Sequence, residues 1–331
     1  MAEIKILTEA ELRSQISLDH QAIDCIEQAF LALATKPVVM PPIMRLDIID
    51  NNGEIDVKTA YIPGLDSLAI KISPGFFDNP KLGLPSVNGL MVLFSTRTGL
   101  VEALLLDNGF LTDIRTAAAG SVAAKHLSRT DSHHAAIIGA GVQAALQLEA
   151  LTLVRDIKSV TLWARDFDKA QKAANQIGTK LNLDIVPCQT IAETTEHADI
   201  IVTTTPSTEP LLQLKDIRPG QHITAMGSDS EHKNELEAAI IADPRVAYFC
   251  DRLSQTQTLG ELHHAIEKGL ISNSTEFPEI GQVIAGQKSA RCSNEEITIC
   301  DLTGTGIQDT AIATLAYQLC LKNKAGTNFE N

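Results

Sequence analysis

A glycine-containing turn near the middle of the chain constrains the fold most strongly. The apolar run Ala135–Ile138 leads directly into Gly139–Ala144, with the sequence GAGVQA, and an apolar helix follows. Gly139 permits a tight turn, Gly141 allows a ligand to approach the backbone, and Ala144 replaces a third glycine where the helix packs. A buried strand, a tight turn and a helix amino terminus in this order are typical of a site for the pyrophosphate of a dinucleotide.

The segments around this turn alternate between strand and helix patterns. After a polar break at residues 128–133, strands are predicted at residues 135–138, 159–164, 199–204, 222–226 and 246–250, with helices starting at Val142 and Asp168. Such alternation is typical of a doubly wound parallel sheet with helices on both faces. We therefore predict an α/β fold with a Rossmann dinucleotide-binding domain over residues 128–301.

The segments before the break show a different pattern. A capping box at Thr8–Glu11 and helical spacing over residues 19–33 indicate that the chain opens with helices. Short strand patterns follow at residues 55–61, 68–72, 90–94 and 101–106, and then an alanine-rich helix at residues 110–127. These patterns predict an α+β domain with a mostly antiparallel sheet over residues 1–127. We assign residues 302–331, which include an apolar helix, to the same domain, although periodicity alone does not decide where they pack.

Length, charge and cysteine spacing narrow the classes of function. The 331 residues suffice for two domains, no apolar run approaches the roughly 18 residues of a membrane span, and the amino terminus lacks a signal-peptide pattern, so we expect a cytoplasmic protein. The net charge of −14 at pH 7 disfavours nucleic-acid and membrane partners, and an anionic ligand would need a local cationic pocket. The six cysteines lie far apart and the histidines show no metal-ligand spacing, so we expect free thiols and no metal site.

Two opposite charges end the second predicted strand of the Rossmann domain. Arg165 suits the 2′-phosphate of NADP, whereas Asp166 suits the ribose hydroxyls of NAD, so these residues leave the choice of dinucleotide open. An exposed ion pair without a ligand is the competing interpretation. Two further predicted strands end at the carboxyl edge of the sheet, where such folds bind ligands; the residues there are Thr204, Thr205, Met226, Gly227 and Ser228.

Four cations of the first domain lie where an anion is expected to bind. Strand alternation places Lys71 and Lys58 each on the face opposite the apolar residues of its strand. Arg115 lies in the first turns of a predicted helix, where a cation opposes the helix dipole and needs a compensating anion. An ion pair with Asp113 or Asp107 is the competing interpretation for Arg115. Arg45, the fourth cation, follows a pair of prolines that lead into a strand.

Motifs distributed along the whole chain resemble those of a known family. They are Asp113–Ala118 (DIRTAA), Gly139–Gln143 (GAGVQ), Gly227–Asp229 (GSD) with Lys233, and Asp301–Gly304 (DLTG). With them the chain resembles the ornithine cyclodeaminases, mu-crystallin and the archaeal-type alanine dehydrogenases. The resemblance implies an NAD(P)-dependent oxidoreductase that acts on the C=N or CH–NH2 group of a small amino acid. It also implies a homodimer built through the sheet of the first domain.

The resemblance further implies roles for individual residues. It places Arg45, Lys71 and Arg115 on the α-carboxylate of the substrate and Ser86 nearby, with Lys71 a candidate catalytic residue as well. Asp229 would be the acid/base beside the nicotinamide; its competing interpretation is a cap on a following helix over residues 231–239. The expected cofactor is NAD(H) in preference to NADP(H), and its expected contacts are Thr116, Gly139, Ala140, Gly141, Val142, Gln143, Arg165, Asp166, Thr204, Thr205, Met226, Gly227, Ser228, Lys233 and Gly304.

Lys58 departs from the pattern of the ornithine cyclodeaminases. Those enzymes carry a glutamate at this position, thirteen residues before the lysine that matches Lys71, to hold the distal ammonium group of ornithine. A lysine would repel that ammonium group and attract a second carboxylate, so it argues against the cyclodeaminase reaction.

The sequences around Lys58 and Lys71 are also similar to the ectoine-utilisation cyclodeaminase-like subgroup, which includes the iminosuccinate reductase of the β-hydroxyaspartate cycle. We therefore predict reduction of iminosuccinate, a dicarboxylic imine, to L-aspartate. Reduction of Δ1-pyrroline-2-carboxylate, alanine dehydrogenation and ornithine cyclodeamination are the enzymatic alternatives. A small-ligand-binding protein like mu-crystallin is the alternative from another class.

Overall fold

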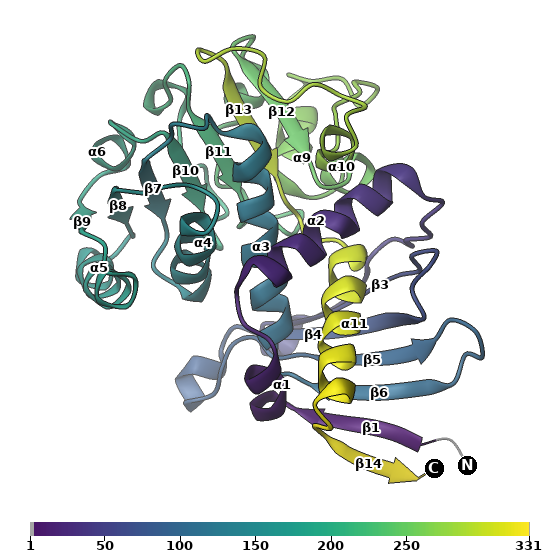
Figure 1. The fold of residues 1–331 in the computed structure, drawn as a ribbon. Coiled ribbons are helices and arrows are strands. Elements are labelled where there is room, and N and C mark those ends of the chain that lie inside the picture. Colours follow the sequence, from purple (N-terminus) through teal and green to yellow (C-terminus); the bar gives the residue numbers. More distant parts are fainter. Residues whose placement is uncertain (1–2, 331) are drawn as a thin grey trace. The chain divides into compact units, whose positions relative to one another are not determined.

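A computed structural model of the chain describes residues 3–330 (Figure 1). The described residues form two compact units: the first contains the chain up to Arg115 and from Thr305 onward, and the second spans Thr116–Gly304. Helix α3 (Phe110–Leu127) is continuous across the division at residues 115 and 116. The division therefore lies earlier in the chain than the polar break that follows α3. Sequence reasoning placed it at the polar break because an unbroken helix gives no signal for a domain boundary. The predicted limits of 1–127 with 302–331, and 128–301, stay a prediction.

The first unit contains a seven-stranded sheet with the order β14-β1-β6-β5-β4-β3-β2. Its strands are β1 (Glu3–Thr8), β2 (Met44–Ile48), β3 (Gly53–Ala60), β4 (Ser67–Phe76), β5 (Leu90–Ser95), β6 (Val101–Leu106) and β14 (Thr327–Glu330). All neighbouring strands are antiparallel except β1 and β6, which are parallel. The predicted mostly antiparallel sheet is confirmed.

The expectation that the chain opens with helices is wrong. Residues 3–8 form β1, which pairs with both β6 and β14. Helix α1 (Glu9–Gln15) follows, and its Thr8–Glu11 capping box is present as predicted; α2 (His20–Thr35) comes next. Strand β1 is only six residues long, and its last residue, Thr8, is also the N-cap of α1. The capping box is the stronger signal in this segment, so the sequence predicted a helix and not the strand before it. The short 3-10 helices of this unit are η1 (Ile49–Asn51) and η2 (Asn79–Leu82).

Helix α11 (Gly306–Lys322) packs closely on strands β3 and β4 (Figure 1). A Cβ atom at Gly306 would lie 2.3 Å from the carbonyl oxygen of Thr59, so only glycine permits this approach. One turn later, the Thr310 hydroxyl donates to the carbonyl oxygen of Ala60 at 2.9 Å and accepts from the backbone N–H of Ala69 at 3.2 Å. The last helix of the chain therefore belongs to the first unit.

The two faces of the first sheet differ in burial. On β4, Ser67, Ala69 and Lys71 are buried, whereas Leu68, Ile70 and Ile72 on the opposite face are only half-buried. The register places more apolar residues on this second face, namely Met44, Leu46, Ile55, Val57, Leu90, Val92 and Leu104. Met44 and Leu46 are about half exposed, at 53% and 52%. This apolar face, defined by these ten residues of β2 to β6, is a candidate contact surface.

The second unit contains a seven-stranded parallel sheet with the order β12-β13-β11-β10-β7-β8-β9. Its strands are β7 (His134–Ile138), β8 (Ser159–Trp163), β9 (Ile185–Cys188), β10 (Ile200–Thr203), β11 (His222–Ala225), β12 (Val246–Cys250) and β13 (Ile297–Asp301). The chain runs outward from β7 to β9 and then resumes on the other side of β7 at β10. This reversal between β7 and β10 is the switch point at which doubly wound sheets bind ligands. The predicted Rossmann fold is confirmed.

Helices and a further 3-10 turn complete the second unit. They are α4 (Val142–Thr152), α5 (Phe167–Leu181), α6 (Ile191–Thr195), η3 (Leu214–Asp216), α7 (Ala238–Ile241), α8 (Leu253–Thr256), α9 (Gly260–Glu267) and α10 (Ile280–Ile284). Buried apolar residues from the strands and from helices such as α4, α5, α7 and α9 form the core of this unit. Within residues 3–330, no helix combines the length and apolar character that crossing a membrane requires. All six cysteines are free thiols.

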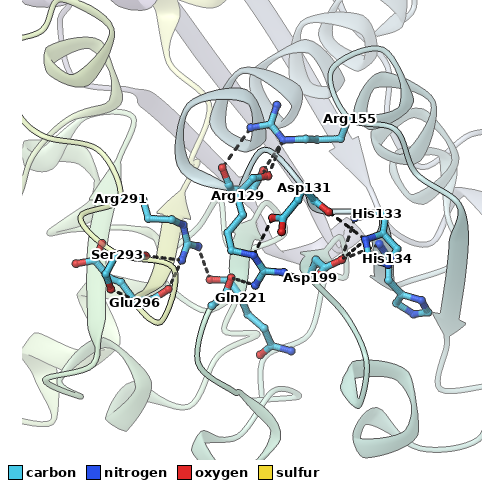
Figure 2. A network of polar contacts seen from close by, with 12 residues as sticks. Arg129, Asp131, His133, His134, Arg155, Asp199, Gln221, Arg291, Ser293 and Glu296 are labelled. Carbon is cyan, nitrogen blue, oxygen red and sulfur yellow. Dashed lines mark hydrogen bonds and ion pairs between the residues drawn. The ribbon is translucent and has the colours of Figure 1, made fainter.

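Arginines secure the carboxyl-terminal end of α3 within the second unit (Figure 2). Arg155 donates to the carbonyl oxygens of Ala124 and Lys125 at 3.0 and 2.8 Å, and Arg291 donates to that of Leu127 at 3.0 Å. The Ala124 carbonyl also accepts from the N–H of Ser128 at 3.0 Å, and cations match the negative end of the helix dipole. Beside them, Arg129 forms a 2.6 Å ion pair with Asp199. The network has a structural role and its donors are already occupied.

Candidate functional sites

A cavity of about 450 Å3 lies at the carboxyl ends of β7, β8 and β10. It is lined by Gly139, Ala140, Gly141, Trp163, Ala164, Arg165, Asp166, Lys169, Thr204, Thr205, Pro206, Ser207 and Leu211. Seven of these residues were predicted as cofactor contacts from the sequence. The others are Trp163 and Ala164 at the end of β8, Lys169 of α5, and Pro206, Ser207 and Leu211 after β10. A cavity at the switch point is where a dinucleotide is expected to bind.

The two glycines of the turn have different structural roles. Gly139 has a φ of +133°, and a Cβ atom there would lie 2.3 Å from Oγ1 of Thr204. Gly141 is the N-cap of α4 and provides no side-chain hydrogen bond to the helix, and a Cβ atom there would have no atom within 4 Å. The space at Gly141 and the N–H groups at the start of the 11-residue helix α4 fit the approach of a pyrophosphate.

The charged edge of the cavity contains Arg165, Asp166 and Lys169, all exposed. Asp166 is the N-cap of α5 and accepts through Oδ1 from the backbone N–H groups of Asp168 and Lys169, at 3.0 and 3.3 Å. The cap fixes the position of this carboxylate at the mouth of the cavity. Both Arg165 and Asp166 line the cavity, and their roles in binding a dinucleotide stay predictions.

Glu235, which sequence reasoning did not identify, joins two strand ends beside this cavity. Its buried carboxylate accepts from the N–H of Thr205 at 2.6 Å, the hydroxyl of Thr203 at 2.6 Å and the N–H of Gly227 at 2.8 Å. Burial raises the pKa of the Glu235 carboxyl above its ordinary value, and these hydrogen bonds oppose that shift. The residue fixes the ends of β10 and β11 relative to each other. A lone glutamate in a loop gives no sequence signal of this kind.

The loop that carries Asp229 is ordered by contacts within the second unit. Lys233 forms a 2.5 Å ion pair with the exposed Asp229, and the carbonyl oxygen of Lys233 contacts Nε2 of His264 at 2.8 Å. The Glu261 carboxylate accepts from the N–H groups of Glu235 and Leu236 at 2.9 and 3.0 Å. No helix is present at residues 229–237, so the competing interpretation of Asp229 as the cap of a helix at 231–239 is wrong. The turn residues Glu231 and His232 replace that helix.

The other predicted cofactor residues lie on several elements of the second unit. Met226, Gly227 and Ser228 follow β11, and Val142 and Gln143 begin α4. The carbonyl oxygen of Thr116, on α3, accepts from Gln147 at 3.0 Å, and the N–H of Gly304 donates to Asp251 at 2.8 Å. These backbone contacts are structural, and the cofactor roles of the residues stay predictions.

In the first unit, the register places the predicted substrate cations on one face of the sheet. Lys58 of β3 pairs directly with Lys71 of β4, and Arg45 of β2 pairs with Asp56 on the same face of β3 as Lys58. Lys58 and Lys71 are 7% and 2% exposed. Arg115, 6% exposed, adds a guanidinium from α3. Buried cations this close together require anions, which the fold or a ligand must supply.

One carboxylate, Asp309 of α11, supplies part of that compensation. It is fully buried and lies 3.1 Å from Nζ of Lys71 and 3.1 Å from Nε of Arg115. Burial tends to raise the pKa of Asp309, but the charges of Lys71, Arg115 and Lys58 hold it below its ordinary value. The sequence suggests Asp113 or Asp107 as an ion-pair partner of Arg115, and the structure adds Asp309 as a partner from a distant part of the chain.

The side chain of Lys71 has a pKa far below that of an ordinary lysine. Burial, followed by the charges of Arg115 and Lys58, lowers the pKa of Lys71 to about 7, although Asp309 acts in the opposite direction. Asp107, at the start of α3, is also buried and interacts with Lys71. Lys71 can therefore bind a carboxylate as a cation below this pH and exchange a proton near it.

Arg45 and Ser86 lie at the periphery of this cluster. Arg45 is half-buried and contacts the carboxylates of Asp47 at 2.9 Å, Glu54 at 2.5 Å and Asp56 at 3.8 Å. Ser86 is half-buried, and its carbonyl oxygen accepts from the N–H of Phe76 at the end of β4. To bind a substrate carboxylate, Arg45 would have to break some of these ion pairs. The substrate-binding roles of Arg45 and Ser86 stay predictions.

The second unit has a parallel sheet with a glycine turn and a cavity at its switch point, and the first unit clusters buried cations. Together they define a two-part dinucleotide-binding protein. The model of the ornithine cyclodeaminase/mu-crystallin family matches residues 2–324, and the chain belongs to this family. A Rhizobium meliloti (strain 1021) protein named as a dehydrogenase is 62% identical over 331 residues, which are 100% of both chains.

Solved structures of several enzymes share the fold over nearly the whole chain. Δ1-pyrroline-2-carboxylate reductase of Thermococcus litoralis, in complex with NADH and L-proline, is 32% identical with a TM-score of 0.93, covering 98% of this chain and 100% of the other. An archaeal alanine dehydrogenase dimer with bound NAD is 35% identical with a TM-score of 0.92, covering 99% of each chain. Iminosuccinate reductase of Paracoccus denitrificans with NAD+ is 29% identical with a TM-score of 0.91, covering 99% and 100%.

Proposed function

We propose that this protein is an NAD(H)-dependent oxidoreductase of the imine or amine group of a small amino acid, and that its substrate is the dicarboxylic imine iminosuccinate. The related reductases and dehydrogenases support the reaction class and the cofactor. The choice of substrate rests on the position of Lys58. It is buried and lies directly opposite Lys71, on the sheet face that carries the cations predicted to bind the substrate carboxylate. A lysine at this position can bind a second carboxylate of the substrate by a charge-assisted hydrogen bond.

In this proposal the cations bind and orient the substrate. Lys71 and Arg115 hold the α-carboxylate, and Lys58 holds the β-carboxylate. Bound NADH would supply a hydride to the imine carbon. Asp229 hydrogen-bonds the imine nitrogen and keeps it protonated, which makes the carbon more electrophilic, and the reduced product is L-aspartate. Lys233, in contact with Asp229, holds its carboxylate in place.

Δ1-Pyrroline-2-carboxylate is the second candidate substrate. The Thermococcus litoralis reductase in complex with NADH and L-proline has the highest TM-score of the three structures described, 0.93. That reaction would use one carboxylate, and Lys58 would then have only a structural role. Alanine dehydrogenation would likewise leave Lys58 without a carboxylate to bind.

A steady-state assay separates these functions. We would measure oxidation of NADH and of NADPH with freshly generated iminosuccinate, with Δ1-pyrroline-2-carboxylate, and with pyruvate plus ammonia. The variants are Lys58→Glu and, as a control for a surface lysine, Lys158→Glu. Loss of a charged hydrogen bond should lower kcat/KM for iminosuccinate by roughly 10- to 100-fold in Lys58→Glu. Preference for the cyclic imine, unchanged by Lys58→Glu, would refute the dicarboxylate assignment and leave the reductase class.

We further propose that the protein is a homodimer joined through the apolar face of the first sheet. The support is the half-buried apolar face of β2 to β6 and the dimeric state of the related archaeal alanine dehydrogenase. Light scattering of Val92→Glu tests it. A monomer is expected for the variant and a dimer for the wild type, whereas a wild-type monomer would refute the proposal.

A further inference from the structure

The first turn of α11 contains several buried polar atoms without a hydrogen-bond partner in the described residues. They are Nε2 of Gln308, Oγ1 of Thr305 and both carboxylate oxygens of Asp309, and Nε of Arg115 adds another from α3. The Asp309 oxygens and Arg115 Nε have ion-pair distances of 3.1 Å but not hydrogen-bond geometry. Nε2 of Gln308 differs from the Asp309 and Arg115 atoms, because it belongs to an uncharged amide that forms no ion pair.

The side-chain amide of Gln308 has a defined orientation. Its Oε1 accepts from the backbone N–H of Thr305, the N-cap of α11, at 3.1 Å and from Nη1 of Arg115 at 3.0 Å. Both partners can only donate, so the oxygen must face them and the NH2 group must point elsewhere. The donor Nε2 is therefore the end of a fully buried side chain that the protein does not use.

A buried donor without a partner destabilises the folded state, so such atoms in a folded protein usually serve a ligand or an ordered water. The neighbours of this donor identify the ligand chemistry. Gln308 contacts Arg115, and Asp309 contacts both Arg115 and Lys71, the two cations to which the proposed function assigns the α-carboxylate. A carboxylate on Arg115 offers acceptor oxygens, whereas a protonated imine nitrogen offers none.

We propose that Gln308 is a substrate-binding residue whose amide Nε2 donates to the α-carboxylate of the imino acid held on Lys71 and Arg115. This inference rests on the proposed placement of that carboxylate, but not on the identity of the rest of the substrate. Asp309 belongs to the same arrangement as a positioning residue, because it lies between the two cations and sets their spacing. The first turn of α11 thus forms a wall of the substrate site that the sequence motifs do not mark.

Two variants of Gln308 separate donation from structural support. Gln308→Glu keeps an acceptor for Thr305 and Arg115 but removes the donor, whereas Gln308→Met removes both. If Nε2 binds substrate, each variant should raise KM for the imino acid by roughly 10- to 100-fold, with NADH affinity within about twofold of wild type. If Gln308 only supports Arg115 and the helix cap, Gln308→Glu keeps the wild-type KM and the proposal fails. The control is Thr314→Val on the same helix, which removes another buried, unpartnered hydroxyl away from the cations and should change neither constant.

A structure of the wild-type protein with its product amino acid decides the case even if the variants do not fold. The expected result is a distance of about 2.7–3.2 Å between Gln308 Nε2 and a carboxylate oxygen of the product. A carboxylate on Arg115 without contact to Nε2 would overturn the inference. The ligand is the product of whichever imino acid the wild type reduces, so a failure of the iminosuccinate assignment leaves this test intact and is seen separately in the wild-type assay.

Discussion

Lys58 and Lys71 face each other directly across the β3–β4 pair, and both side chains are buried. Like charges at directly opposite positions of a sheet are destabilising, so this pair opposes folding unless anions compensate it. Asp309, whose pKa the charges of both lysines and of Arg115 lower, is one such anion. In the proposed function, these cations are already in place when the carboxylates of the substrate bind.

Removing the charge of Lys58 should raise the pKa of Lys71. The charge of Lys58 is among the causes that lower this pKa to about 7, together with burial and Arg115, while Asp309 raises it and the buried Asp107 also faces it. Only charged Lys71 binds a carboxylate well, so kcat/KM of the wild type should fall as the pH rises through about 7. In Lys58→Met this decline of kcat/KM should move to higher pH. The measurement is kcat/KM between pH 5.5 and 9, with whichever imino acid the wild type reduces. A shift of the decline to lower pH would contradict the argument.

Removing the charge of Asp309 should have the opposite effect on Lys71. Without this carboxylate, which raises the pKa of Lys71, burial and the two remaining cations lower it further. The decline of kcat/KM in Asp309→Asn should therefore move to lower pH than in the wild type. Breaking a buried ion pair also destabilises a protein by about 3–5 kcal/mol, which urea unfolding at pH 7 would measure. A variant with wild-type stability and pH profile would show that Asp309 is not the counterion of Lys71.

The features of this fold that depend on local sequence could be predicted. The turn at Gly139 and Gly141 lies between a buried strand and a helix that are contiguous with it, so all the parts of the pattern occur within one segment. Lys71 and Lys58 were found for the same reason, because alternation along a strand determines which face each residue occupies. Strand β1 was not predicted, since its pairing with β14 joins the two ends of the chain.

The residues that contact the buried cations from α11 come from a distant part of the chain, and sequence patterns did not identify them. Arg115 and Gln308 are 193 positions apart, and no pattern within α11 identifies the partner of either. A weak signal was present: Thr305 and Gln308 have the spacing of a capping box, and Asp309 follows them in an otherwise apolar helix. A buried charge in an apolar helix indicates that a partner exists, but only the packing of α11 on β3 and β4 shows which one.

Glu235→Gln should weaken both the second unit and its binding of NADH. The carboxylate accepts from Thr205, Thr203 and Gly227, and an amide would turn an NH2 group toward one of these donors. We expect a loss of about 1–3 kcal/mol in the free energy of unfolding and a higher Kd for NADH, since these residues end β10 and β11 beside the cavity. The control is Glu237→Gln, whose carboxylate accepts from the N–H of Leu214 and lies outside these strand ends. Equal effects of the two substitutions on NADH binding would contradict a specific role for Glu235.

The two glycines of the turn should respond in opposite ways to the same added methyl group. In Gly139→Ala the methyl lies 2.3 Å from Oγ1 of Thr204 at a φ of +133°, so the fold must shift and stability should fall by about 1–3 kcal/mol. In Gly141→Ala, at a φ of −89°, the methyl meets no atom within 4 Å, so stability should be unchanged or rise by up to about 1 kcal/mol.

The same space at Gly141 is where the pyrophosphate is expected to approach, so Gly141→Ala should bind NADH more weakly while its thermal unfolding temperature is maintained. Fluorescence titration with NADH, alongside thermal unfolding of both variants, measures the two effects separately. Wild-type affinity in Gly141→Ala would mean that the dinucleotide does not pass over this turn, whereas weak binding in a fully stable variant would show that the position is kept free for the ligand and not for the fold.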